Sequence, residues 1–168
     1  GKVGFAEEGA AGAFKDGTPF DAPGDAFVPK PVAVPPEAAP CLVWLAAPEA
    51  TPGAPLARPQ GEGARFAVAP EDLRNLLDPD ARPEPVELGR LDLALHAGER
   101  PAGWDALPVA RVLEVAQGRV RLDPGFAPPL LDVAASPVIL RLLRDVSARL
   151  EAKAADLAGP LGTAGGLS

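Results

Sequence analysis

The chain has 168 residues and a formal net charge of −7. This negative charge argues against nucleic acid and anionic membrane surfaces as its main partners. Cys41 is the one cysteine, which excludes an internal disulfide and fits a reducing compartment. The length suffices for one domain with a hydrophobic core. No run approaches the roughly 18 apolar residues of a membrane span, and the first residues lack a signal-peptide pattern.

The first part of the chain is predicted to form short strands separated by loops. Its apolar runs are punctuated by many of the 22 prolines and 18 glycines, a pattern typical of an ordered β-rich domain. Lys2–Ala6 and Ala13–Phe14 are strand candidates, and a tight turn is predicted at Asp16–Pro19. Phe27–Val34 contains prolines, which cannot donate to a β-ladder, so it is predicted to be an edge strand or an extended segment.

The most buried strand is predicted at Cys41–Ala46. This run is continuously apolar, as expected for a central strand that is covered on both faces. Pro48–Gly63 is rich in alanine, proline and glycine and predicts a long exposed loop. Arg65–Ala69 is a short strand candidate, and Glu71–Leu77 is either a helical turn or the continuation of that strand.

The segment Val86–Ala97 changes its phase of alternation. Its first apolar residues lie in one phase and its later ones in the other: Val86 and Leu88, then Leu91, Leu93 and Leu95. Because a slip of one residue sends every side chain to the opposite face of a sheet, a bulge or break is predicted near Gly89-Arg90. After this break, His96 falls on the polar face of the strand.

A β-hairpin and a turn are predicted after Trp104. Apolar and polar residues alternate in Val109–Val115 and in Arg119–Leu122, on either side of a Gln-Gly pair at 117–118. The Asp-Pro-Gly sequence at 123–125 then predicts a tight turn. Trp104 itself is interpreted as an anchor in the core or at the rim of the domain.

A long helix is predicted from Pro137 to Ala158. Ser136 can cap its first turn, Pro137 has no N–H to lose there, and a Gly-Pro pair at 159–160 ends it. Five apolar residues recur at heptad-like spacing and are the candidate helix-packing or oligomer interface: Ile139, Leu143, Val146, Leu150 and Leu157. Two interpretations stay open, because such a face packs either on its own domain's sheet or against another helix.

Residues that could carry catalysis or bind a metal are scattered along the chain. His96 is the only histidine, and with one distant cysteine it forms no zinc-site pattern, so it is interpreted as a solvated side chain. The acids at 78, 80 and 84 lack the glycine and the glutamate of a calcium loop, and no Gly-x-Ser-x-Gly motif is present. The acid pairs Glu7-Glu8, Glu71-Asp72 and Asp78/Asp80 would need a shared cleft for acid–base work. The sequence therefore predicts no enzyme, no catalytic residues, no cofactor and no metal.

Four runs of the sequence resemble one family in the same order and at similar separations: the type VI secretion baseplate subunit TssK, also called ImpJ or VasE. They are DGTPFDAP at 16–23, CLVWLAAP at 41–48, LPVARVLEV at 107–115 and VRLDPGFAPPLLDVAASPVILRLLRDV at 120–146. The last run is the most specific, and residues 48–85 are the least similar.

The resemblance implies a cytoplasmic, non-enzymatic homotrimer. In this family a β-sandwich shoulder domain of the phage receptor-binding-protein type docks on the wedge proteins TssF and TssG. A helical neck follows, and a C-terminal head contacts the membrane complex of the contractile injection machine. The chain resembles most of the shoulder and the first neck helix, without the family's N-terminal segment, the rest of the neck or the head.

We therefore expect a mainly β, β-sandwich-like fold with one long C-terminal helix. Residues 1–134 are expected to form the shoulder domain, and residues 135–168 a helix leading into a neck. The predicted function is that of a structural baseplate component, a trimeric adaptor between wedge and membrane complex that binds no nucleic acid. The alternative is a β-sandwich module for a small ligand or glycan, with Trp104 and the Pro48–Gly63 loop at its mouth.

Overall fold

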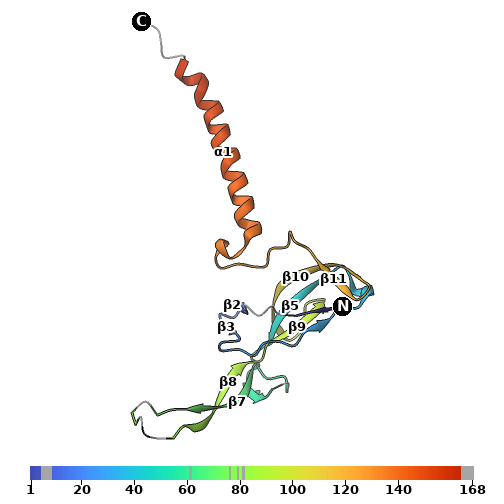
Figure 1. Ribbon diagram of the computed structural model, residues 1–168, viewed down its shortest axis with the longest axis vertical. Helices are drawn as coiled ribbons and strands as arrows, with labels where there is room; N and C mark the ends of the chain where they lie inside the picture. The colour runs from blue at the N-terminus through green and yellow to red at the C-terminus, as the bar shows by residue number, and fades with distance from the viewer. Residues whose placement is uncertain (5–8, 61, 76, 79, 81, 164–168) are drawn as a thin grey trace. The chain divides into compact units, whose positions relative to one another are not determined.

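The computed structural model describes residues 1–4, 9–60, 62–75, 77–78, 80 and 82–163, with the backbone alone for 159–163. The chain divides into two compact units, Gly1–Pro124 and Gly125–Ser168. The described part of the first unit consists mainly of β-strands, and that of the second mainly of one long helix (Figure 1). The expected fold class, mainly β with a long helix near the C-terminal end, is confirmed.

The largest sheet has the strand order β11-β10-β5-β9, and all its pairs are antiparallel. At its centre, β5 (Cys41–Pro48) pairs with β10 (Trp104–Ala116) on one side and with β9 (Ala94–Gly98) on the other. The outer strand beside β10 is β11 (Arg119–Leu122). The central strand predicted at Cys41–Ala46 is thus confirmed, and it continues to Pro48.

Three small sheets complete the strands of the described residues. β1 (Lys2–Val3) pairs with β4 (Val32–Ala33), β2 (Ala10–Ala13) pairs with β3 (Pro19–Ala22), and β7 (Phe66–Leu73) pairs with β6 (Ala57–Pro59) and β8 (Glu84–Leu91). The first strand is shorter than predicted, and residues 5–6 of that prediction lie outside the described residues. The predicted loop at 48–63 contains the short strand β6, and Glu71–Leu77 begins as a continuation of β7 rather than as a helical turn.

The hydrophobic core lies on one face of the four-stranded sheet. The largest fully buried side chains are Val34, Val43, Leu45 and Val112. Phe14 and Phe20, at the two ends of the turn between β2 and β3, join the same cluster with their ring centroids 5.0 Å apart. The β2–β3 hairpin therefore packs its aromatic rings against the sheet.

The predicted break near Gly89-Arg90 is wrong. β8 pairs with β7 from Glu84 to Leu91 without a shift of register, and the chain leaves the strand only at Asp92. Val86 is 41% exposed, so its side chain does not have to lie on the same buried face as the leucines that follow. Those leucines at 91, 93 and 95 are all buried, as their alternation predicted.

The predicted hairpin around residues 117–118 is confirmed. Gln117 has a φ of 50° and Gly118 a φ of 75°, the positive values that a two-residue type I′ turn requires at both central positions. This turn matches the twist of the strands that it joins, β10 and β11. The first strand of the hairpin begins at Trp104, earlier than the Val109 expected from the alternation.

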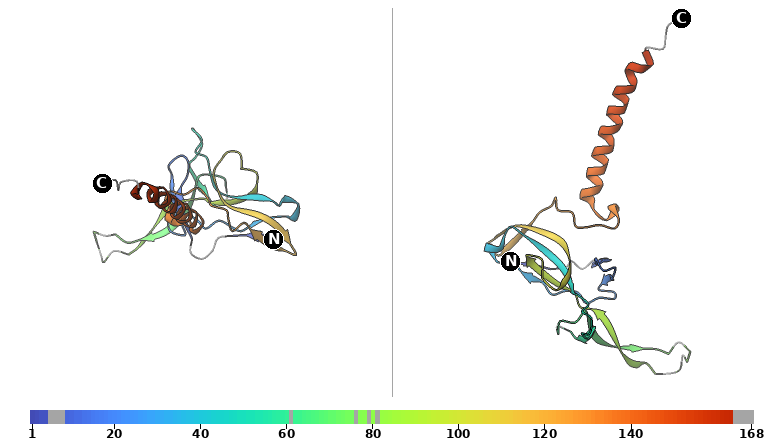
Figure 2. Two further views of the ribbon diagram at one scale, coloured as in Figure 1. Left: turned by 90° about the horizontal axis from the view of Figure 1, so that it is seen from above. Right: turned by 180° about the vertical axis from the view of Figure 1, so that it is seen from behind.

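The helix α1 spans Pro137–Thr163 and is one continuous helix, orange to red in Figures 1 and 2. Its predicted start is confirmed, since the Ser136 hydroxyl oxygen accepts a hydrogen bond from the Ile139 N–H at 3.4 Å. Its predicted end at Ala158 is wrong. Pro160 removes one backbone hydrogen bond, but this loss does not prevent the neighbouring residues from staying helical.

Truncation of the central core residue tests this packing. Leu45 is 1% exposed, so Leu45→Ala is expected to lower the free energy of unfolding by about 2–5 kcal/mol, through lost burial and the cavity left behind. Urea denaturation measures the change. Leu77→Ala is the matched control, because Leu77 is 96% exposed and its truncation should change stability by no more than about 0.5 kcal/mol. Equal losses in the two variants would contradict the assigned core.

Candidate functional site

A row of exposed apolar side chains runs along α1. The exposed fractions are 46% for Leu143, 45% for Val146, 65% for Leu150 and 62% for Leu157, whereas Ile139 is half-buried. Residues three and four apart lie on one face of a helix, so these five residues form a single apolar row, here called the α1 stripe. Such a stripe is typical of a helix that packs against other helices.

A buried arginine, which the sequence did not reveal, joins separate segments of the first unit. Arg65 is 4% exposed, and its Nη1 donates to the carbonyl oxygen of Pro48 at 2.8 Å. Its Nη2 donates to the hydroxyl oxygen of Thr18 at 2.8 Å and to the carboxylate of Asp16. The guanidinium also lies 5.9 Å from the ring centroid of Phe14, within the range of a cation–π contact. The Asp-Gly-Thr turn therefore fastens the β2–β3 hairpin to the end of β5.

Asp16 is held in its charged form by this arrangement. Partial burial disfavours the charge, but hydrogen bonds from the backbone N–H and side chain of Thr18 and the positive charge of Arg65 outweigh it and lower the pKa of Asp16 below 3.8. The backbone N–H of Asp16 in turn donates to the buried carboxylate of Asp105 at 3.3 Å. The turn is thus tied to β10 as well as to Arg65.

Two rings pack together on the face of the sheet opposite the core. The ring centroids of His96 and Trp104 lie 4.7 Å apart with the planes at 62°. His96 pairs with Trp44, and Trp104 pairs with Pro48, so the register places all four residues on this second face. Nε2 of His96 is buried without a hydrogen-bond partner, and burial lowers the pKa of His96 below 6.5. The interpretation of His96 as a solvated side chain is wrong, because a ring from another strand covers it.

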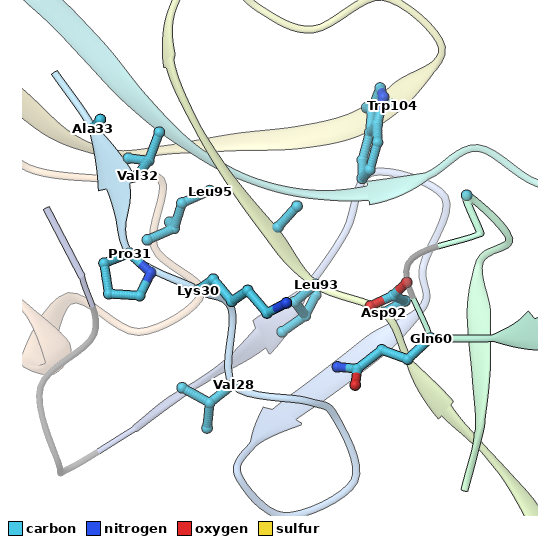
Figure 3. Close-up of a pocket in the computed structure, with 12 residues that line it drawn as sticks. Val28, Lys30, Pro31, Val32, Ala33, Gln60, Asp92, Leu93, Leu95 and Trp104 are labelled. Atoms are coloured by element: carbon cyan, nitrogen blue, oxygen red, sulfur yellow. The ribbon is translucent and has the colours of Figure 1, made fainter. Parts of the chain in front are cut away.

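A pocket of about 500 Å³ lies beside β9 (Figure 3). The residues that line it are Val28, Lys30–Ala33, Gln60, Gly63, Asp92–Leu95 and Trp104. Trp104 and two residues of the 48–63 loop therefore meet at one opening, as the ligand-binding alternative requires.

The acid pairs singled out in the sequence can be located only in part among the residues that the structure describes. No group of three His, Cys, Asp or Glu side chains there could hold a metal ion. Asp78 and Asp80 lie in an exposed turn, where the Asp80 N–H donates to the Asp78 side chain at 3.2 Å. The pair Glu7-Glu8 lies outside the described residues. Among those residues, no helix has both the length and the apolar character needed to cross a membrane.

These features define a mainly β domain followed by a helix suited to packing against other helices. Over residues 3–167 the chain matches the family described as "Bacterial Type VI secretion, VC_A0110, EvfL, ImpJ, VasE". The chain belongs to this family, which confirms the resemblance seen in the sequence.

Relatives of known identity share both sequence and fold with the chain. The type VI secretion system baseplate component TssK1 of Pseudomonas aeruginosa is 31% identical over 166 residues, which are 95% of this chain and 37% of that protein. A crystal structure of TssK matches with a TM-score of 0.78 and 29% identity, over 91% of this chain and 36% of that one. A TssK-TssF-TssG baseplate subcomplex has a chain of the same fold, with a TM-score of 0.72 and 24% identity, over 89% of this chain and 51% of that one. The chain thus spans little more than a third of the curated relative.

Removal of the buried guanidinium is expected to destabilise the first unit. Arg65→Met keeps most of the buried volume but leaves the Pro48 carbonyl oxygen and the Thr18 hydroxyl without their donor, at a cost of about 1–3 kcal/mol. The ion pair itself adds little to this, because the Asp16 side chain is 41% exposed. Urea unfolding measures the loss, and Arg58→Met, at an exposed arginine of β6, is the matched control. Equal stability of the two variants would show that Arg65 does not fasten the hairpin.

His96 is expected to make folding stability depend on pH below about 6.5. Because folding lowers the pKa of His96, the unfolded state binds the proton more tightly. The stabilising contribution is complete above the unfolded pKa and is lost as the pH falls through the lower folded value. His96→Gln should flatten this part of a stability profile followed by tryptophan fluorescence. The contribution of Asp16, whose pKa is lowered by folding, begins to be lost only at the lower pH of its unfolded pKa, 3.8. An unchanged slope in the variant would contradict the role of His96.

Proposed function

We propose that this chain is part of a structural, non-enzymatic component of the type VI secretion baseplate, acting in the cytoplasm. The observation that carries the proposal is the match of residues 3–167 to the type VI secretion family. The identity of 31% to a baseplate component supports it. Because a chain of the same fold occurs in a TssK-TssF-TssG subcomplex, the proposed partners are the corresponding wedge proteins.

We propose that the two parts of the chain have different roles. Residues 1–134 act as the shoulder domain that faces the wedge, and residues 135–168 lead into a helical neck. The start of α1 at Pro137 supports this division, and the two compact units of the chain divide ten residues earlier, after Pro124. In the longer protein, a region beyond the neck would contact the membrane complex, so that the whole acts as an adaptor.

We propose that the α1 stripe joins three copies of the protein. Four of its five side chains are between 45% and 65% exposed. Their burial in a helix–helix interface would contribute about 25 cal/mol for each Å² of apolar surface removed from water. A heptad-like row is the pattern through which helices associate in small bundles.

One experiment tests both the assembly and the partners. The longer protein that contains this chain should elute as a trimer and co-purify with the TssF and TssG proteins of the same bacterium. The double variant Leu143→Gln/Leu150→Gln should elute as a monomer, because two apolar residues of the stripe become polar. Size-exclusion chromatography with light scattering measures the mass.

The control and the outcomes separate the parts of this proposal. Arg144→Gln/Glu151→Gln changes two exposed residues off the stripe without changing the net charge, and it should stay trimeric. A trimeric Leu143→Gln/Leu150→Gln variant would show that the stripe is not the interface. Wild-type protein that fails to co-purify with either wedge protein would contradict the baseplate role.

The pocket beside β9 favours a second candidate function, the binding of a small ligand or glycan. Trp104 supplies an aromatic wall of the kind that sugars contact. The polar side chains that line the pocket are Lys30, Gln60 and Asp92, and most of the remaining wall is aliphatic. This composition suits a partly apolar occupant better than a glycan.

A further inference from the structure

The β7–β8 hairpin is packed only at its base. Ala67 is 1% and Leu91 3% exposed there, and among the described residues β6 pairs with β7 only at 66–68. The outer half, residues 69–88, is here called the β7–β8 arm, and it contains two paired strands without a third. Figure 1 shows it extending away from the four-stranded sheet. Because a two-stranded hairpin is only marginally stable by itself in water, a partner surface would stabilise the arm.

The outer edges of the arm are interrupted by proline. The Phe66 N–H donates to the carbonyl oxygen of Leu56 at 2.9 Å, on the side of β7 away from β8. Backbone groups alternate in direction along an antiparallel pair, so residues 68, 70 and 72 also point outward, and so do the residues opposite them in β8. Pro70 and Pro85 occupy two of these outward positions and have no N–H. Each edge therefore lacks a donor that an added strand would need, which leaves the faces of the arm for binding.

One face of the arm is apolar. Residues that lie opposite each other in a strand pair share a face, and side chains two apart along a strand do so as well. The register therefore places Ala69, Leu73, Val86 and Leu88 on one face. Leu73 is 40% and Val86 41% exposed, whereas Leu88 is half-buried. This apolar face lies open to solvent over the described part of the arm.

The arm is also strongly acidic. Residues 70–88 contain six acidic residues and two arginines, so they carry a net charge of −4 out of −7 for the whole chain. Among the described residues, only Glu71 of the six has a basic partner, Arg90 at 2.8 Å. Glu84 shares the apolar face, and Glu87 lies on the opposite face. Carboxylates beside an apolar face complement a surface that carries positive charge.

The charge of the arm argues against a second copy of the chain as its occupant. The arm and the whole chain are both negative, so their mutual approach is opposed by repulsion. The prolines on both outer edges also prevent two arms from pairing continuously strand to strand. The occupant is therefore a different protein.

We propose that the apolar face of the β7–β8 arm docks on a partner protein whose surface combines lysine or arginine with apolar side chains. The contact buries Leu73 and Val86, and the acidic residues around them attract and pair with the positive charges. The inference rests on the proposed function, so the partner is one of the two wedge proteins, and the arm is the site that holds it. Docking also supplies the packing that the two-stranded arm lacks.

The affinity of the full-length protein for the TssF and TssG proteins of the same bacterium tests the apolar contact. Leu73→Ser/Val86→Ser should weaken binding about tenfold or more, as expected for residues at the centre of an interface. Val28→Ser/Leu122→Ser is the matched control, because these residues are 49% and 45% exposed and lie outside the arm. It should leave the affinity unchanged. Biolayer interferometry measures both.

Charge reversal tests the chemistry of the partner. Glu84→Lys/Glu87→Lys should weaken binding about tenfold and reduce the dependence of the affinity on salt. Glu49→Lys/Glu99→Lys makes the same charge change at two exposed acids outside the arm, and it should bind like wild type. In the wild-type protein, hydrogen–deuterium exchange of residues 86–88 should become slower when the wedge proteins bind.

The other results overturn the inference. Wild-type protein that binds neither wedge protein would contradict the baseplate role and the docking arm together. Wild-type binding that Leu73→Ser/Val86→Ser retains in full, or that leaves the exchange of residues 86–88 unchanged, would exclude the arm alone. Equal losses in the two charge-reversal variants would assign the effect to the whole chain. Loss of trimer mass in the arm variants, with wedge binding intact, would make a second copy the occupant.

Discussion

The arrangement of the first unit depends on one buried group, the guanidinium of Arg65. A charge at 4% exposure is tolerated only where its N–H groups are satisfied, and here they bind the end of β5 and the turn of the β2–β3 hairpin. The backbone of the same residue acts as well, because its carbonyl oxygen accepts the N–H of Asp92 at 3.0 Å. Asp92 lies where the chain passes from the β7–β8 hairpin to β9. One residue thus fixes the hairpin, the central strand and the entry of β9 into the sheet.

The two faces of the four-stranded sheet carry different groups of side chains. One face carries the core around Leu45 and Val112, which stabilises the unit. The other carries the Trp104–His96 pair, in which a ring contact replaces solvent around a histidine. In the second unit, the α1 stripe is suited to contacts between helices.

Local chemistry in the sequence predicted the elements whose signals are local. The turn at 117–118, the central strand from Cys41 and the cap at Ser136 were all found this way. Arg65 was not, because the groups that its side chain binds are 17 to 49 residues away in sequence. The prediction of a break near Gly89 was wrong because Val86 lies in an exposed part of its hairpin. Burial does not fix there on which face of the sheet a side chain lies. His96 has the polar-face position that alternation predicts, but only the three-dimensional register shows that Trp104 covers it.

The segment beside β9 also bears on how the protein survives before it is assembled. An unoccupied strand edge is a template on which identical chains can stack into aggregates. Residues 30–33 line the same pocket as residues 92–95, and β4 lies close to β9, so this edge of the sheet has no room for a strand from another copy. Coverage of the edge by this segment would then keep free subunits from stacking on one another through β9.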